Sequence, residues 1–159
     1  MVYAVLIIIA ASVAIDQALK TIVVNTLEIG QSVPLIEGVF HFTYIQNFGA
    51  AFSILQNKQA FLIIVTALVM AIAAAVLFKN INKLSRLIVL SLAFIIGGGI
   101  GNLIDRIRLG YVVDFLDFTL INYPVFNFAD CCVVLGSIAL VIGVFLADRA
   151  ERKQGKLNG

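Results

Sequence analysis

The stretch LIVLSLAFIIGGGIGNLI, Leu87–Ile104, runs for 18 residues without a charged side chain. An α-helix of that length covers about 27 Å, close to the thickness of the hydrocarbon core of a bilayer. Two further uncharged runs, Phe61–Phe78 and Cys131–Ala147, have nearly the same length. The first stretch therefore predicts a membrane-spanning helix, and its two companions predict that the chain crosses the bilayer repeatedly.

The composition of the chain agrees with a membrane protein. Its 159 residues are 62% hydrophobic and 13% charged, whereas soluble domains carry roughly 45–50% apolar and about 25% charged residues. We find no internal repeat and no linker, so we expect a single integral-membrane domain over residues 1–159. The net charge of +2 gives no reason to expect a nucleic-acid partner.

The N-terminal segment, residues 3–24, is apolar except around Asp16 and Lys20. A cleaved signal peptide is the alternative to a spanning helix here, because ASVA (residues 11–14) resembles a small-residue cleavage site. Signal peptides begin with basic residues, and this segment has none before its apolar run. We therefore expect four spans, at approximately residues 3–24, 61–78, 87–105 and 129–147, in a mainly helical membrane fold.

The basic residues predict how these spans are oriented. Seven of the 11 Lys and Arg fall in the loop between the second and third spans or in the C-terminal tail: Lys79, Lys83, Arg86, Arg149, Arg152, Lys153 and Lys156. Basic loops tend to stay in the cytoplasm. Both chain ends are therefore expected in the cytoplasm, and residues 25–59 and 106–128 are expected to form outer segments.

The first outer segment contains the run VFHFTYI, Val39–Ile45. Its aromatic residues alternate with His41 and Thr43, which predicts a β-strand with one aromatic side. A small sheet that rests on the membrane surface would bury that side. The outer part of the protein is therefore expected to contain β-structure.

Polar side chains gather where the expected spans reach the outer surface. Asp16 and Lys20 have the spacing of an ion pair along one helix. Asn102, Asp105 and Arg106 lie within little more than one turn, behind glycines that would let another helix approach closely. An ion-paired structural clasp and a substrate-positioning role fit this second cluster equally well.

Two further acids lie close to the fourth span. Asn127 and Asp130 open that span, and taken alone they suit an N-cap and a helix N-terminal acid. Asp114 lies between apolar residues in YVVDFLDF, whereas Asp117 suits a solvated acid. If the outer ends of the third and fourth spans pack together, Asp114 and Asp130 converge. Two carboxylates in a poorly hydrated site share one proton, and such a pair can activate water as in an aspartic protease.

Other chemistries fit the sequence less well. His41 is the only histidine, and neither a H-E-x-x-H nor a G-x-S-x-G motif is present. A proton- or ion-coupled relay remains an alternative, although the acids gather toward one face and the second span has no ionisable residue. A non-catalytic scaffold held together by its polar clusters also remains open. The adjacent Cys131 and Cys132 suit small apolar residues within a span.

Four segments, in chain order, resemble the lipoprotein signal peptidases, or signal peptidase II family. They are AIDQALKTIV (Ala14–Val23), QNFGAAF (Gln46–Phe52), GNLIDRIRLGYVVDF (Gly101–Phe115) and FNFAD (Phe126–Asp130). The resemblance runs from the first expected span to the last. It implies an aspartic endopeptidase, without metal or organic cofactor, that removes the signal peptide of prolipoproteins before a diacylglyceryl-modified cysteine.

The resemblance also implies roles for individual residues. The catalytic pair falls on Asp114 and Asp130. Substrate-positioning or site-shaping residues fall on the following positions: Asn47, Asn102, Arg106 and Asn127. Asp16 corresponds to a structural acid, and Cys131 departs from the small hydroxyl residue that the family commonly has there. The implied setting is the bacterial cytoplasmic membrane, with the active site on the extracytoplasmic side, membrane lipid and prolipoproteins as partners, and a monomeric enzyme.

Overall fold

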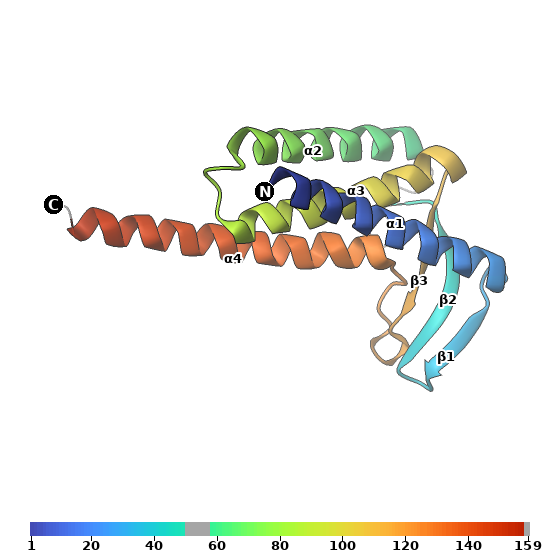
Figure 1. Ribbon diagram of the computed structural model, residues 1–159. Coiled ribbons are helices and arrows are strands. Elements are labelled where there is room, and N and C mark those ends of the chain that lie inside the picture. Colours follow the sequence, from blue (N-terminus) through green and yellow to red (C-terminus); the bar gives the residue numbers. More distant parts are fainter. Residues whose placement is uncertain (50–57, 158–159) are drawn as a thin grey trace.

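Four long helices give the molecule its shape in the computed structural model (Figure 1). They are α1 (Val2–Thr26), α2 (Gln59–Asn80), α3 (Arg86–Leu109) and α4 (Phe128–Leu157). Each is long and apolar enough to cross a membrane, so the four spans predicted from the sequence are confirmed. The structure describes residues 1–49 and 58–157, with side chains to residue 153; the end of the QNFGAAF segment, residues 50–52, lies outside the described residues.

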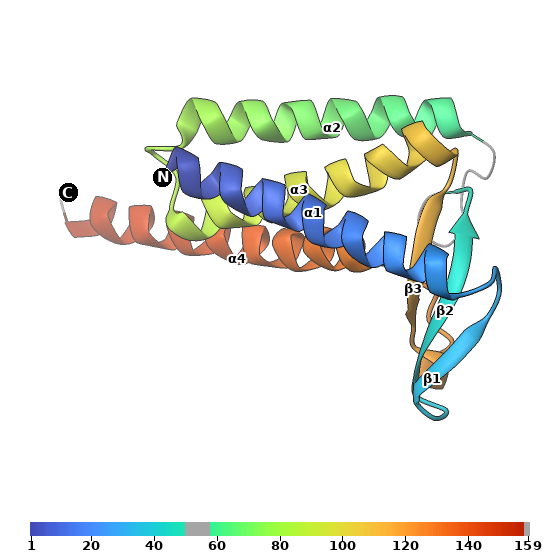
Figure 2. The same ribbon diagram turned by 45° about the vertical axis from the view of Figure 1, so that its right-hand side comes forward.

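α3 is the central helix of the bundle. It contacts α1, α2 and α4, and Figures 1 and 2 show α2 and α4 on opposite sides of it. More than half of its apolar window is buried inside the protein, against less than a quarter for each of the other three. The outer helices therefore expose most of their apolar surface, as expected of helices that face lipid.

The glycine run of α3 allows this close packing. A Cβ placed on Gly97 would lie 2.7 Å from the Cβ of Ser12 in α1, and one placed on Gly98 would overlap the carbonyl oxygen of Ala129 in α4. A Cβ on Gly101 would lie 2.5 Å from a carboxylate oxygen of Asp16. The predicted role of these glycines in close helix approach is confirmed.

A three-stranded antiparallel sheet, in the order β1–β2–β3, lies at one end of the bundle. Its strands are β1 (Ser32–Ile36), β2 (Phe40–Asn47) and β3 (Val112–Asp117), and a 3-10 turn, η2 (Thr119–Ile121), follows β3. The predicted strand at residues 39–45 is confirmed as β2. The sheet projects to one side across the ends of the helices (Figures 1 and 2).

A small apolar core fixes the sheet to α1. Val23 at the end of α1 packs with Tyr44 of β2 and with Val113 and Phe115 of β3, and all four are buried. Successive strand residues point to opposite faces, so Asp114 points away from this core. α3 ends just before β3 at Gly110, which has a positive φ of 79° and donates its N–H to the carbonyl of Arg106. This short turn holds Asp114 close to the end of α3.

Candidate active site

Asp114 and Asp130 line the same pocket, although 15 residues of chain and a change of element separate them. The pocket has a volume of about 460 Å³ and lies between the end of α3, the sheet and the start of α4. Its polar wall consists of Asn47, Asn102, Arg106, Asp114 and Asp130. Its apolar wall consists of Ile45, Val112, Tyr123, Pro124, Val125, Phe126, Val133 and Val134. The convergence of the two acids expected from the sequence is therefore observed.

Asp130 is positioned by the way α4 begins. The backbone N–H of Asp130 donates to Oδ1 of Asn127 at 2.9 Å, and the backbone N–H of Asn127 donates to Oδ2 of Asp130 at 3.1 Å. This reciprocal pair is a capping box, with aspartate in the place of the usual glutamate. The N-cap and N-terminal acid expected at these positions are both present. They hold the Asp130 carboxylate in one orientation at the pocket.

The side chain of Asn127 connects the two acids. Its Nδ2 donates to Oδ1 of Asp114 at 2.6 Å and to Oδ1 of Asn102 at 3.1 Å, and Asn127 is fully buried. Asn102 in turn donates from Nδ2 to Oδ1 of Asp130 at 2.8 Å. Two asparagine amides thus form a frame between the carboxylates. The frame fixes each carboxylate relative to the other.

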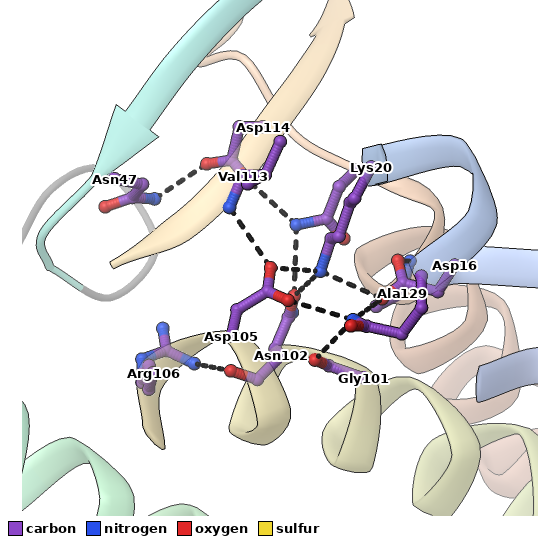
Figure 3. Close-up of polar contacts among 12 residues, drawn as sticks. Asp16, Lys20, Asn47, Gly101, Asn102, Asp105, Arg106, Val113, Asp114 and Ala129 are labelled. Atoms are coloured by element: carbon purple, nitrogen blue, oxygen red, sulfur yellow. Dashed lines mark hydrogen bonds and ion pairs between the residues drawn. The ribbon is translucent and has the colours of Figure 1, made fainter. Parts of the chain in front are cut away.

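Asn47 supplies the second hydrogen bond to Asp114. Its Nδ2 donates to Oδ2 of Asp114 at 2.8 Å, and its own Oδ1 accepts the backbone N–H of Gly49 at 2.9 Å. Asn47 is the last residue of β2, and it pairs with Val112 at the start of β3. The register of these two strands therefore places Asn47 beside Asp114 (Figure 3).

The environment of Asp114 favours its protonated form. Burial, and after it the negative charge of Asp130, raise the pKa of Asp114 to about 7, although the hydrogen bonds from Asn47 and Asn127 act in the opposite direction. Only 2% of Asp114 is exposed. A pair in which one carboxyl group holds a proton near neutral pH can act as both acid and base.

Arg106 contributes a cation to the pocket wall. It donates to the carbonyl of Gly49 at 3.1 Å and to that of Asn102 at 3.5 Å. Its buried Nε has no hydrogen-bond partner among the residues that the structure describes. Within the described part of the chain, the Nε–H is therefore available to donate a hydrogen bond to a ligand carbonyl in the pocket.

Lys20 forms a second polar layer behind the pocket (Figure 3). Its ammonium lies 2.9 Å from Oδ2 of Asp16, 2.8 Å from Oδ2 of Asp105 and 2.9 Å from Oδ1 of Asn102. Lys20 is only 3% exposed. An ammonium has three protons to donate, and this one has three acceptors around it. The predicted Asp16–Lys20 ion pair is confirmed, and it belongs to a larger network.

The acids of this second layer also fasten other elements. Asp16 accepts the backbone N–H of Ala129 in α4 at 3.0 Å, and Asp105 accepts that of Val113 in β3 at 3.2 Å. Gln17 donates to Asp105 at 2.9 Å. The cluster expected at Asn102–Arg106 therefore divides into two parts. Asp105 belongs to a clasp with Lys20, whereas Arg106 faces the pocket.

Two contributions to the site were missed in the sequence. The connection of Lys20 to Asn102 was missed because these residues lie on different helices, and only their packing reveals it. The pocket wall from Tyr123 to Phe126 was also missed, since this turn has no periodic pattern. Asp117 is hydrogen-bonded to Thr43 at 2.6 Å and is not part of the pocket. Cys131 and Cys132 are free thiols.

The described residues contain no cluster of three or more His, Cys, Asp or Glu that could hold a metal ion. What they do contain is an acid pair in a partly apolar pocket at the ends of four spanning helices. This combination defines a membrane protein with the functional groups of an aspartic hydrolase.

Comparison with known proteins identifies the family. A family model described as signal peptidase (SPase) II matches residues 8–146. The lipoprotein signal peptidase of Brevibacillus brevis is 45% identical over 143 residues, which is 90% of this chain and 95% of that protein. That of Halothermothrix orenii is 44% identical over 142 residues, or 89% and 93% of the two chains. The chain belongs to the signal peptidase II family of aspartic peptidases, whose members remove signal peptides from prolipoproteins.

Solved structures agree with this assignment. A structure described as a bacterial membrane enzyme superposes with a TM-score of 0.86 at 29% identity, covering 95% of this chain and 92% of that one. A second structure with the same description gives a TM-score of 0.81 at 30% identity, covering 91% and 94%. The chain is therefore a multi-pass membrane protein with the fold of these bacterial membrane enzymes.

Proposed function

We propose that Asp114 and Asp130 are the catalytic pair of this peptidase. The observation that carries the proposal is the amide of Asn127, which donates to Asp114 while its residue closes the capping box on Asp130. Both carboxylates are thereby held at one pocket. Because the pKa of Asp114 is raised to about 7, its carboxyl group can hold the proton that the pair needs near neutral pH.

The reaction needs one water molecule and one shared proton. One carboxylate removes a proton from the water as it attacks the scissile carbonyl carbon, and the other, protonated carboxyl group protonates the carbonyl oxygen. The resulting tetrahedral diol collapses when the C–N bond breaks. The protonated carboxyl group gives its proton to the leaving amine, and the other carboxylate takes the proton of one diol hydroxyl, so one carboxyl group of the pair again holds a proton.

The substrate is a prolipoprotein, cut before a cysteine that carries a diacylglyceryl group. The pocket suits such a peptide because its polar wall adjoins Val133 and Val134 of α4. Val134 is more than half exposed on a helix long and apolar enough to span the membrane. Acyl chains on the substrate can therefore remain in lipid while its peptide bond reaches the acids.

The remaining pocket residues hold the acids and the substrate. Asn47, Asn102 and Asn127 orient the carboxylates through the hydrogen bonds described above. Arg106 donates to a carbonyl group of the substrate from its Nε, which has no partner among the described residues. Asp16 is a structural acid, since its contacts are to Lys20, Gln17 and the backbone of Ala129.

The charge distribution supports the orientation of the protein, and its bacterial relatives support the membrane in which it lies. The protein lies in the bacterial cytoplasmic membrane as a single peptidase domain, with both ends in the cytoplasm and the pocket on the extracytoplasmic side. It works as a monomer, without metal, organic cofactor or nucleic acid. Its partners are prolipoproteins and membrane lipid.

A gel-shift assay tests the catalytic pair directly. Purified protein in detergent micelles is incubated with a diacylglyceryl-modified prolipoprotein, and the shift to the mature size is followed for the unaltered protein and for Asp114→Asn and Asp130→Asn. Both variants are expected to lose cleavage by at least about three orders of magnitude, since each removes a partner of a concerted acid–base pair. A prolipoprotein without the lipid modification is expected to remain uncut.

Asp117→Asn is the matched control, because Asp117 lies on the same strand as Asp114 but outside the pocket and bonds to Thr43. It is expected to cleave at a rate close to that of the unaltered protein. Folding is checked by the helical circular dichroism and the melting temperature of each variant. Cleavage by a well-folded Asp114→Asn or Asp130→Asn variant would refute the assignment of the pair.

A further inference from the structure

Four large apolar side chains lie exposed at the far end of the sheet. Leu35 and Ile36 end β1, and Leu120 and Ile121 lie in η2; each of the four is more than half exposed. Apolar side chains exposed on the spanning helices are explained by lipid, but these four are not on those helices. We call this group the apolar tip.

The two halves of the tip are joined to each other. The backbone N–H of Leu120 donates to the carbonyl of Val39 in the β1–β2 turn at 3.4 Å. The rings of Phe40 and Phe118, next to these two segments, lie 4.8 Å apart. The tip is therefore one surface of the folded sheet rather than two separate loops.

The chain connects the tip to the start of α4. Residues 123–126, which follow η2, line the pocket together with Val133 and Val134 of the second turn of α4. Val134 and Leu135 of that turn are more than half exposed. The sheet projects sideways from the helix ends rather than onward along their axes (Figures 1 and 2), so the tip lies to the side of the helix ends.

The charges near the tip exclude an electrostatic attraction to anionic headgroups. Residues 29–49 and 110–127 contain no Lys or Arg, and their acids are Glu37, Asp114 and Asp117. Attraction to a membrane must therefore come from apolar contact. Amphipathic elements with an apolar face enter the boundary between headgroups and acyl chains in this way.

We propose that the apolar tip inserts into the interface of the same bilayer that the helices span, to the side of the helix ends. The occupant of this surface is lipid acyl chain and not a second protein. The sheet is thereby held against the membrane at two places, by the Val23–Tyr44 core at α1 and by the tip. The inference concerns how the sheet is supported and does not depend on which residues catalyse the reaction.

The chain has no tryptophan, so a single introduced tryptophan reports on one position. The test compares Ile121→Trp with Ile29→Trp, each reconstituted in phosphatidylcholine vesicles with and without brominated acyl chains. Ile29 is the matched control, because it is 65% exposed against 67% for Ile121 but lies in the turn after α1, away from the tip. Ile138→Trp, on the exposed face of α4, is the reference for full contact with lipid.

Bromine near the headgroup end of the acyl chain is expected to quench Ile121→Trp several-fold more than Ile29→Trp. Bromine near the chain terminus is expected to quench Ile138→Trp more strongly than Ile121→Trp, because the tip is shallow. Adding Leu120→Asp to Ile121→Trp is expected to reduce the quenching toward that of Ile29→Trp. The quenching is expected to be the same when anionic lipid or salt is added.

Two results would overturn the proposal. Equal quenching of Ile121→Trp and Ile29→Trp would place the tip in water. A blue-shifted emission from Ile121→Trp without quenching by brominated lipid would mean that protein, such as a second copy of the chain, covers the tip. Helical circular dichroism of each variant shows that the reporter is read from folded protein. Cleavage of prolipoprotein is measured separately, so failure here leaves the assignment of the acid pair unaffected.

Discussion

The ammonium of Lys20 in α1 lies 2.9 Å from Oδ1 of Asn102 in α3, and the amide of Asn127 approaches the same oxygen at 3.1 Å. Two donors at one end of the Asn102 amide require that end to be the oxygen. The Nδ2 of Asn102 is then directed to Asp130, to which it donates at 2.8 Å. Lys20 thus determines how one carboxylate is held without touching it.

Lys20→Met is expected to lower kcat about tenfold or more with little change in KM, because the Asn102 amide loses a donor that fixes its orientation. It also leaves Asp16 and Asp105 without their buried cation, which costs about 3–5 kcal/mol of unfolding free energy. Steady-state kinetics and melting in detergent measure the two effects. Lys83→Met, at an exposed position in the α2–α3 loop, is the control and is expected to change neither.

A second substitution separates positioning from stability. Adding Asp105→Asn to Lys20→Met removes one of the unpaired buried charges, so the melting temperature is expected to recover in part. The Asn102 amide remains unsupported, so kcat is expected to stay low. Recovery of both quantities together would mean that Lys20 acts only on stability.

The pKa of Asp114 predicts how activity depends on pH. The pair needs one proton, and the pKa of Asp114 is about 7, so kcat/KM is expected to fall as the pH rises through about 7. The hydrogen bond from Asn47 lowers this pKa, so Asn47→Ala should move the basic limb to higher pH. A pH profile of kcat/KM with a lipidated substrate measures the basic limb of the unaltered protein and of Asn47→Ala. An unmoved limb in Asn47→Ala would contradict this account of the Asp114 carboxyl group.

The same group predicts a loss of stability between mildly acidic and neutral solution. The pKa of Asp114 is raised from 3.8 to about 7 on folding, so between these values the folded state binds a proton that the unfolded state has lost. Stability therefore falls as the pH rises through this window and changes no further above it. The melting temperature of the protein is expected to fall between about pH 4 and about pH 7. In Asp114→Asn this fall should be much smaller, whereas Asp117→Asn should retain it.

Substitution by alanine is expected to have different effects at two neighbouring glycines of α3. A Cβ on Gly98 would overlap the backbone carbonyl oxygen of Ala129, which cannot move without α4. A Cβ on Gly99 would instead meet the sulfur of Met70, a flexible side chain. Gly98→Ala is expected to cost about 1–3 kcal/mol of stability and to reduce cleavage, since Ala129 adjoins Asp130. Gly99→Ala is expected to cost little, and similar melting temperatures for the two variants would contradict this account.

The orientation in the membrane is tested with a fused phosphatase that is active only outside the cytoplasm. Fusion at the C-terminus is expected to give an inactive phosphatase, because the tail carries basic residues that stay in the cytoplasm. Fusion after Asn122, in the second outer segment, is expected to give an active one. The reverse pattern would place the pocket on the cytoplasmic side and contradict the proposed setting.

The sequence predicted most of the helices and part of the sheet. Uncharged runs such as Leu87–Ile104 predicted the spans, because only a helix can satisfy its backbone across a bilayer. β2 was found from its alternation, but β1 and β3 were not. Pro34 interrupts β1, and prolines are a signal against a strand. In β3, Asp114 faces the pocket from between apolar neighbours, which removes the alternation of a half-buried strand.

The residues of the candidate site were predicted from the sequence, but the hydrogen bonds between them were not. Asp114, Asp130 and the three asparagines were singled out from the motifs; four of them line one pocket, and the fifth, Asn127, is buried and donates to Asp114 and Asn102. Their hydrogen bonds join residues from four different elements, and no local pattern in the chain specifies such contacts. The partner of Asp105 illustrates the limit, because its nearest cation in sequence is Arg106 whereas its ion pair is with Lys20.

The capping box at Asn127 and Asp130 makes the start of α4 and the assembly of the pocket a single event. If α4 began one residue earlier or later, another side chain would occupy the position of Asp130, and the amide of Asn127 would no longer reach Asp114. On the proposed assignment of the acid pair, activity therefore depends on the register of the last helix. On the same assignment, a molecule whose final span begins at the wrong residue is expected to be inactive.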